Sequence, residues 1–285
     1  MEKVLLFGAG LRGRDYLYTK IQSAVGGGGY CVGILDNSPE KQGSEVHGVP
    51  VYPPEKAREL EFDKAVICVN EQSRRESMFE QLKSLGVPEE KIQYHKQSDA
   101  DDKRYGLVQR FSRLAREQNI SGAAAECGVF RGAFAKEINK AFPDRKLYLF
   151  DTFTGFDERD IAREPSVSKC IEAGLSNQTS IETVMGKMKH PENVIIKKGY
   201  VPETFAGVDE VFAFVSLDMD LYAPTLAALE FFAPRMSPGG VICMHDWYNE
   251  IVFHIKDALY DFERRSGRRL NKIPLCDELS MVLVF

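Results

Sequence analysis

The chain has 285 residues, 44% of them hydrophobic, which is enough for two domains with sizeable cores. Its 37 lysines and arginines against 42 aspartates and glutamates give a formal net charge of −5. This balance argues against a nucleic-acid partner, because nucleic-acid binders usually carry a basic face. No apolar stretch approaches the roughly 18 residues of a membrane span, so we expect no membrane partner. The six cysteines form no Cys-x-x-Cys pair, which is typical of reduced thiols in a cytoplasmic protein.

Residues 1–97 alternate between strand-like and helix-like segments. Buried strands are predicted at "KVLLFGAG", "YCVGILDN", "KAVICVN" and "KIQYH", and helices over 11–24 and roughly 72–85. Strands separated by helices indicate a parallel sheet that is covered on both faces. The polar, acidic run "KQSDADDK" at 96–103 then marks a domain boundary.

A second domain is predicted over 104–285. It begins with an amphipathic helix, and strands follow at "GAAAECGVF", "KLYLFDTF", "NVIIKKG", "VFAFVSLD" and "GVICMHDW". The last two segments, "KIPLCD" and "SMVLVF", are joined by the polar turn "DELS" and predict an antiparallel hairpin. The fold class is therefore α/β, with two Rossmann-like domains of which the second ends in an antiparallel hairpin.

The first glycine-rich turn, "GAGLRG", contains Gly8, Gly10 and Gly13. It follows a strand and opens a helix, the context in which a glycine loop approaches a pyrophosphate. Asp36 ends the next strand, where a carboxylate can bind ribose hydroxyls. These residues are candidates for binding a nucleotide. The alternative is a glycine-rich turn that only packs the helix on the sheet.

This domain resembles the N-terminal nucleotide-sugar-binding domain of PglD-type sugar acyltransferases. The resemblance lies in "FGAGLRGRDYL" and "GILDNSPEKQGSEVHGVPVY". It implies a Rossmann-like fold, with a nucleotide sugar and NAD both as candidate ligands. An NAD-dependent nucleotide-sugar enzyme acting through this domain is one alternative function.

A second turn, "AECGVFRG", has only two glycines and suits an uncharged or zwitterionic group better than a pyrophosphate. Asp151 ends the following strand and is placed to bind the ribose of an adenosine. This is the pattern of S-adenosylmethionine (SAM) enzymes. Gly128 would allow close approach, Glu126 would bind the methionine amino group, and Arg131 its carboxylate. Phe153 would line the adenosine, although a core position is equally compatible with the sequence.

Acidic residues end two more strands of the second domain. Asp218 and Asp220 follow "VFAFVSL", and His245 and Asp246 follow "GVICM". If these strands are neighbours, the side chains converge at the carboxyl edge of the sheet, where ligands bind in such folds. Carboxylates suit Mg²⁺, whereas an imidazole favours Mn²⁺, Fe²⁺ or Zn²⁺. Asp218 and Asp246 are candidate ligands.

The roles of two of these residues stay open. His245 could be a metal ligand, a general base, or neither. Asp220 could ligate, or it could cap a helix beginning at Pro224. We favour the capping role.

Residues from about 105 to 285 resemble the TylF (macrocin O-methyltransferase) family. The motifs are "ECGVFRG", "LFDTFTGF", "LDMDLYAPTLAALEFFAPRMSPGGVICMHDW" and "IPLCDELSMVLVF", in order and spacing. The resemblance implies a class I SAM-methyltransferase sheet and a SAM- and divalent-metal-dependent O-methyltransferase with a small-molecule sugar or glycoside acceptor. It also implies that the insert at 156–190 covers the active site.

The chain departs from the TylF pattern at one position that bears on the metal. The family usually has an Asp-Asp pair where His245-Asp246 stands here. The carboxylates still favour Mg²⁺, but the imidazole leaves Mn²⁺ open. A SAM- or nucleotide-binding module without metal chemistry is an alternative function. The oligomeric state is open too, with a homo-oligomer as one possibility.

Overall fold

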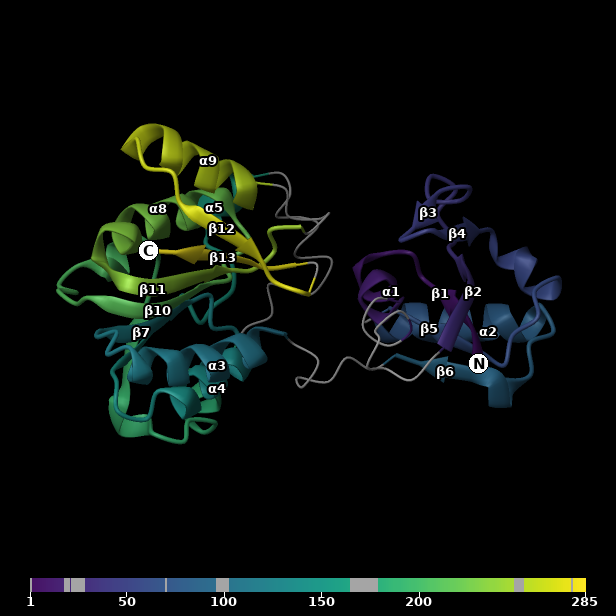
Figure 1. Ribbon diagram of the computed structural model, residues 1–285, viewed down its shortest axis with the longest axis horizontal. Helices are drawn as coiled ribbons and strands as arrows, with labels where there is room; N and C mark the ends of the chain where they lie inside the picture. The colour runs from purple at the N-terminus through teal and green to yellow at the C-terminus, as the bar shows by residue number, and fades with distance from the viewer. Residues whose placement is uncertain are drawn as a thin grey trace. The chain divides into compact units, whose positions relative to one another are not determined.

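The structure is a computed structural model that describes residues 2–17, 21, 29–69, 71–95, 103–164, 179–248, 254–277 and 279–285. The chain divides into two compact units, Met1–Asp101 and Asp102–Phe285, each built around its own sheet (Figure 1). No helix in the described ranges is long and apolar enough to cross a membrane. The predicted α/β class is confirmed.

The first unit has a six-stranded sheet in the order β3-β4-β2-β1-β5-β6. Its elements are β1 (Glu2–Phe7), α1 (Leu11–Tyr16), β2 (Gly29–Leu35), β3 (Glu45–Val46), β4 (Val49–Tyr52), β5 (Lys64–Ile67), α2 (Gln72–Ser84) and β6 (Ile92–Tyr94), with 3₁₀ turns at 54–58 and 89–91. β1 pairs in parallel with β2 and β5. Its alternate side chains are buried in two different cores, as expected for a strand covered on both faces.

One prediction for this unit is tested only in part, and one feature of it was not predicted. The helix predicted over 11–24 is described only as α1, and residues 18–20 and 22–28 lie outside the described residues. The antiparallel hairpin β3–β4 was not predicted. Its turn residues His47 and Gly48 both have positive φ, 48° and 76°. This is the geometry of a type I′ turn, which histidine signals less clearly than asparagine does.

The second unit has a seven-stranded sheet in the order β12-β13-β11-β10-β7-β8-β9. Its elements are α3 (Lys103–Glu117), β7 (Ala123–Cys127), α4 (Ala133–Ala141), β8 (Leu147–Asp151), α5 (Glu158–Ile161), α7 (Ile181–Met185), β9 (Val194–Lys198), β10 (Phe212–Leu217), α8 (Tyr222–Phe232), β11 (Met236–Met244), α9 (Ile255–Ser266), β12 (Asn271–Pro274) and β13 (Met281–Val284), with 3₁₀ turns at 191–193, 203–205 and 233–235. β13 runs antiparallel to both of its neighbours, so the predicted terminal hairpin is confirmed.

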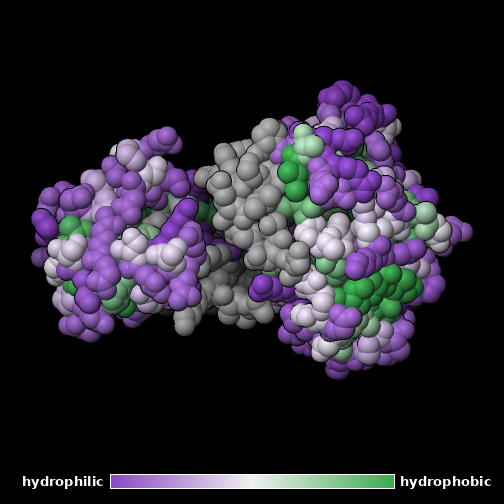
Figure 2. Space-filling view, turned by 180° about the vertical axis from the view of Figure 1, so that it is seen from behind, coloured by the Kyte–Doolittle hydropathy of each residue, from purple (hydrophilic) through white to green (hydrophobic). Residues whose placement is uncertain are grey.

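Aromatic side chains fill the cores on both faces of the second sheet. α3 and α4 cover one face and α8 and α9 the other (Figure 1). Phe214 of β10 contacts Phe111 and Phe134 on the first face, whereas Phe232 of α8 contacts Phe150 of β8 on the second. On the face shown in Figure 2, the coloured residues are mostly hydrophilic, with some hydrophobic patches.

Candidate active site

The register of the second sheet brings the ends of four strands together. Leu217 of β10 pairs with Met244 of β11 on one side and with Cys127 of β7 on the other. Cys127 pairs in turn with Phe150 of β8. The residues that follow these strand ends therefore share one edge. β7 lies where the strand order reverses, which is where ligands bind in open α/β sheets.

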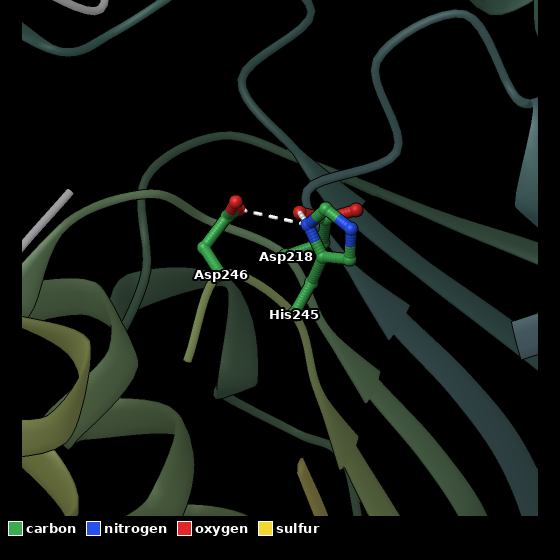
Figure 3. Close-up of side chains that lie close together, drawn as sticks. All are labelled: Asp218, His245 and Asp246. Carbon is green, nitrogen blue, oxygen red and sulfur yellow. Dashed lines mark hydrogen bonds and ion pairs between the residues drawn. The ribbon is translucent and has the colours of Figure 1, made fainter. Parts of the chain in front are cut away.

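Three side chains form the centre of this edge (Figure 3). His245 Nδ1 lies 3.1 Å from Asp218 Oδ1 and 2.8 Å from Asp246 Oδ2. One nitrogen or oxygen atom from each residue lies within 4.8 Å of the others, so the three could hold a metal ion. Asp246 is buried and the other two are partly exposed, which leaves the cluster open on one side.

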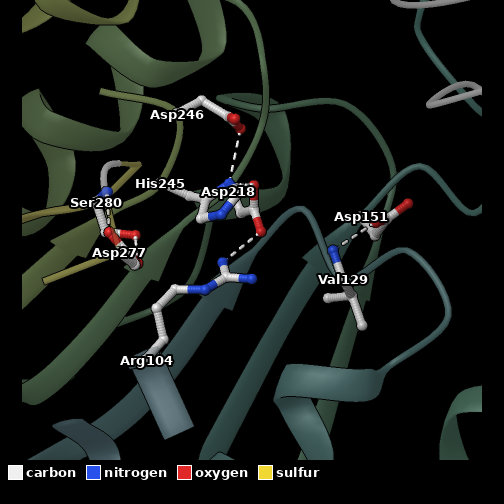
Figure 4. A network of polar contacts seen from close by, with 8 residues as sticks. All are labelled: Arg104, Val129, Asp151, Asp218, His245, Asp246, Asp277 and Ser280. Carbon is white, nitrogen blue, oxygen red and sulfur yellow. Dashed lines mark hydrogen bonds and ion pairs between the residues drawn. The ribbon is translucent and has the colours of Figure 1, made fainter. Parts of the chain in front are cut away.

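The sequence analysis missed a fourth member of this network, Arg104 in the first turn of α3. Its Nη1 donates a hydrogen bond of 2.6 Å to Asp218 Oδ2 (Figure 4). The arginine side chain is only 9% exposed. The sequence held no signal for this contact except a basic residue next to the domain boundary.

The cluster perturbs its own ionisation. Burial and the Arg104 charge disfavour a proton on His245, but the carboxylates of Asp218 and Asp246 outweigh both and raise the pKa of His245 from 6.5 to about 10. Burial would raise the pKa of Asp218, but the positive charges of His245 and Arg104 hold it well below its ordinary value. Without another cation, the imidazole therefore carries a proton between two carboxylates at neutral pH.

Asp220 does not cap the following helix, so the favoured prediction for it is wrong. α8 begins at Tyr222, and its N-cap, Leu221, has no side-chain cap. Asp220 instead has a positive φ of 62°, and burial together with the charge of Asp246 raises its pKa well above the ordinary value. Two neighbouring carboxyl groups are stable here only if they share a proton or a cation.

The N-terminus of α8 is capped by a distant residue. The buried Glu164 carboxylate accepts hydrogen bonds from the backbone N–H groups of Tyr222, at 2.9 and 3.1 Å, and of Ala223, at 3.2 Å. A negative charge at this position also complements the helix dipole. Glu164 thereby joins the segment after β8 to the helix that follows the Asp218–Asp220 loop.

A cavity opens beside the cluster, with about 730 Å³ of non-atom space including its mouth. Gly128, Asp151, Tyr200, Asp218 and Asp220 line it. It joins the glycine turn after β7 to the loop after β10.

Of the predicted cofactor residues, Gly128 and Asp151 line this cavity. Gly128 has a φ of +82°, and a Cβ added to it would lie 1.9 Å from the carbonyl oxygen of Asp218. Asp151 Oδ2 accepts hydrogen bonds from the N–H groups of Val129 and Phe130, and its Oδ1 accepts one from Phe153. The aspartate thus holds the glycine turn in place.

The other three SAM-binding candidates of the second unit are not among the residues that line the cavity. Glu126 is buried within β7, with 2% of its surface exposed. Arg131 is exposed, and its guanidinium lies 5.1 Å from the centre of the Phe130 ring. Phe153 is packed in the hydrophobic core on the α3–α4 side.

The comparison with known families decides the classification. The family model described as "Macrocin-O-methyltransferase (TylF)" matches residues 43–275, which is most of the chain. The chain belongs to the TylF family. It is therefore an enzyme of a methyltransferase family, and the match begins inside the first unit, just before β3.

Two curated relatives support this classification. Mycinamicin III 3''-O-methyltransferase of Micromonospora griseorubida is 27% identical over 180 residues, 58% of this chain and 69% of that protein. The 8-demethyl-8-(2,3-dimethoxy-alpha-L-rhamnosyl)-tetracenomycin-C 4'-O-methyltransferase of Streptomyces olivaceus is 28% identical over 161 residues, 52% of this chain and 60% of that protein. Among solved structures, the O-methyltransferase NovP has a similar fold, with a TM-score of 0.56 at 21% identity over 64% of this chain and 79% of that chain.

The TylF-family cavity also has a polar wall. Tyr200 donates a hydrogen bond of 2.8 Å to Asp160. The Arg159 guanidinium lies 3.7 Å from the centre of the Tyr200 ring. Burial, and then this hydrogen bond, raise the pKa of Tyr200 to about 12, so its hydroxyl stays protonated.

Two aromatic residues follow the cluster in the turn after β11. Trp247 is buried and packs edge-on against Tyr260, whereas Tyr248 is 39% exposed. The Lys256 ammonium lies 4.8 Å from the centre of the Tyr248 ring. Of the insert at 156–190 that we expected to cover the site, residues 165–178 lie outside the described residues.

The first unit of this TylF-family protein has a glycine turn of its own. A Cβ on Gly13 would lie 1.9 Å from the carbonyl oxygen of Gly8, so α1 packs directly on the turn. Gly10 has no such constraint. Asp36 Oδ2 accepts a hydrogen bond of 2.7 Å from Ala9 N–H and Oδ1 one of 2.8 Å from Ser38 N–H. It therefore orders its glycine turn much as Asp151 does.

Proposed function

We propose that the second unit transfers a methyl group from SAM to a hydroxyl of a sugar or glycoside, with the help of a divalent metal. The observation that carries this proposal is the cluster of Asp218, His245 and Asp246 next to a cavity that Asp218 also lines. An acceptor hydroxyl at the cluster would face a methyl donor in the cavity. The enzyme would act by positioning the two reactants, with no covalent intermediate.

The charge of the cavity lining suits SAM. SAM carries a positive sulfonium and a positive ammonium, and the lining includes the carboxylates of Asp151, Asp157 and Asp160. A carboxylate offers about four acceptor positions, and backbone N–H groups use three of those on Asp151. The remaining position would accept a ribose hydroxyl. Gly128 would allow the methionine part to approach the backbone.

The cluster also fits a divalent metal. An ion bound at about 2.1 Å needs adjacent ligand atoms about 3 Å apart, and His245 Nδ1 has this spacing from both Asp218 Oδ1 and Asp246 Oδ2. In the absence of a metal, the proton on His245 partly neutralises the two carboxylates on either side of it. Asp220 beside Asp246 adds a further carboxyl group that a cation would stabilise in its charged form. When bound, the metal would lower the pKa of the acceptor hydroxyl.

We assign Asp218 and Asp246 as ligands and His245 as a third ligand through Nδ1. His245 faces both carboxylates with this atom, whereas a general base would need to face the acceptor. Carboxylates favour Mg²⁺, and the imidazole makes Mn²⁺ the next candidate. Tyr248, two residues after Asp246 in the chain, would stack on the acceptor sugar.

The acceptor class rests on the family and on the relatives' names. One relative's name specifies a rhamnosyl group on tetracenomycin C, and the other's specifies mycinamicin III. Tyr248, which follows Asp246 in the chain and is exposed, is compatible with binding a sugar ring. We therefore propose a sugar hydroxyl on a glycoside or a nucleotide sugar.

The test measures binding first and turnover second. SAM should raise the melting temperature, and Mg²⁺ or Mn²⁺ should add a further increase that EDTA removes. Labelled SAM is then tested with a panel of glycosides and nucleotide sugars. Asp218→Asn should abolish metal binding and methyl transfer, whereas Asp209→Asn, at an exposed residue outside the site, should behave as the wild type. SAM binding without any metal effect would favour a binding module instead.

For the first unit we propose a nucleotide or nucleotide-sugar site at the Gly8–Gly13 turn. The supporting observation is that this turn lies at the end of the central strand β1, with Asp36 bound to the N–H group of Ala9 in the turn. The PglD-like sequence pattern makes a nucleotide sugar one candidate ligand, and NAD is the other. Titration with NAD and with UDP- and TDP-sugars tests this, because Gly13→Ala should abolish the signal, and a signal unaffected by this variant would refute the site.

A further inference from the structure

The two carboxylate oxygens of Asp218 contact different residues, one Arg104 and the other His245. Its Nη1 lies 2.6 Å from Asp218 Oδ2, whereas Asp218 Oδ1 lies 3.1 Å from His245 Nδ1. A carboxylate whose second oxygen is bound to a buried arginine is not free to turn. Only Oδ1 faces the place where His245 and Asp246 meet.

The arginine is itself held firmly. It is buried in the first turn of α3, and its guanidinium lies 4.8 Å from the centre of the Phe134 ring on α4. Tyr105 stacks on the same Phe134 ring, at 5.7 Å and an angle of 6°. The α3–α4 pair therefore sets the guanidinium position, and the guanidinium sets the orientation of Asp218.

We propose that Arg104 is a positioning residue that makes Asp218 a one-oxygen metal ligand. This inference rests on the proposed metal site. If both oxygens of Asp218 bound the ion, they would take a coordination position that the acceptor hydroxyl needs. The guanidinium prevents this by occupying Oδ2, and its positive charge offsets one of the carboxylate charges at the cluster.

The geometry connects Arg104 directly to the cluster. Its guanidinium reaches across 114 residues of sequence to a side chain of the cluster. Arg113, on the same helix, is exposed and provides a matched control.

The experiment compares Arg104→Met, Arg104→Lys and Arg113→Met in the full-length protein loaded with Co²⁺, whose visible absorption reports the number and arrangement of ligands. Arg104→Met should change this spectrum, because Asp218 can then turn both oxygens to the ion. Arg104→Lys keeps the charge but not the planar guanidinium, so its spectrum should lie between those of Arg104→Met and the wild type. Arg113→Met should match the wild type.

At saturating Mg²⁺, methyl transfer by Arg104→Met should fall about tenfold to a hundredfold, the usual effect of losing a residue that orients a ligand.

A wild-type Co²⁺ spectrum in folded Arg104→Met would overturn the inference. If Arg104→Met does not fold, a wild-type spectrum in Arg104→Lys would overturn it equally, since Arg104 would then serve folding alone. Absence of Co²⁺ and Mn²⁺ binding in the wild type is a different result. It would refute the proposed metal site and this inference with it.

Discussion

His245 is held between two carboxylates, and this environment decides its chemistry. Burial opposes the charged form, but Asp218 and Asp246 raise its pKa to about 10. Without metal, the side chain is therefore an imidazolium at neutral pH and cannot act as a base. A metal that binds Nδ1 must first displace this proton.

This displacement predicts pH-dependent metal binding. Between pH 7 and 9 the apparent Mg²⁺ or Mn²⁺ affinity should rise about tenfold per pH unit, with about one proton released per ion. Calorimetry in buffers of different ionisation enthalpy measures both quantities. His245→Gln should abolish the proton release. An affinity independent of pH would show that His245 is not a ligand.

The same pKa affects the stability of the metal-free protein. The folded-state pKa of His245 lies above its ordinary value of 6.5, so the stabilisation is fully present below 6.5 and is lost as the pH rises towards about 10. Urea unfolding of the metal-free protein at several pH values should show this loss. His245→Gln should remove that part of the pH dependence.

Gly128 links the cavity and the cluster through the backbone. In Gly128→Ala the Cβ would meet the Asp218 carbonyl oxygen at 1.9 Å, so one of the two loops must move. We expect weaker SAM and metal binding, and a loss of stability greater than the roughly 1–2 kcal/mol of a left-handed alanine alone. Gly207→Ala is the control, because Gly207 also has a positive φ but open space around it. Equal effects of the two variants on stability and SAM affinity would refute this link.

At the scale of elements, the loops after the strands are tied together by helix ends. α8 starts directly after the Asp218–Asp220 loop, and its first N–H groups are bound by Glu164, which follows α5. The prediction that Asp220 caps this helix failed because a residue 58 positions away had taken the role. Moving α5 would therefore disturb the loop that carries Asp218.

Glu164→Ala should leave these N–H groups of α8 without a partner. We expect a loss of about 1–3 kcal/mol in unfolding free energy, as for removal of a charged, buried cap. Glu164→Gln should lose less, because it keeps one acceptor oxygen. Faster hydrogen exchange at Tyr222 and Ala223 would locate the effect. Glu158→Ala, at an exposed residue of α5, should be close to neutral, and a similar loss there would contradict the capping role.

At the scale of the whole molecule, the chain is two α/β units with separate cores. Each places a glycine turn and an acidic residue at the carboxyl ends of its central strands, with Asp36 and Asp151 in matching positions. The TylF match includes part of the first unit but not its glycine turn. Under the proposals above, the two units bind different ligands.

Two ligands should consequently stabilise two different unfolding transitions. SAM with Mg²⁺ should raise the melting temperature of one transition, and the nucleotide of the first unit should raise that of the other. Each ligand should add about 2.7 kcal/mol to the unfolding free energy of its unit at a hundredfold excess over its Kd. Calorimetry of the full chain, with Asp218→Asn and Gly13→Ala as single-site controls, separates them. A single transition that both ligands raise equally would contradict independent units.

Much of the fold and part of the candidate site could be predicted from the sequence. The strands, the terminal hairpin and the convergence of Asp218, His245 and Asp246 follow from hydrophobic patterns and from where acidic residues end strands. Such signals are local, because a strand end determines the edge of the sheet on which the next residue lies.

Only the tertiary structure decided which partners these residues have. Arg104 reaches Asp218 across 114 residues, Glu164 caps α8 across 58, and Asp220 lies beside Asp246 instead of capping a helix. The sequence by itself determined the edge on which the chemistry lies. Contacts between distant elements depend on how helices pack on a sheet, which no local pattern encodes, and here they determine the charge and orientation of each group in the cluster.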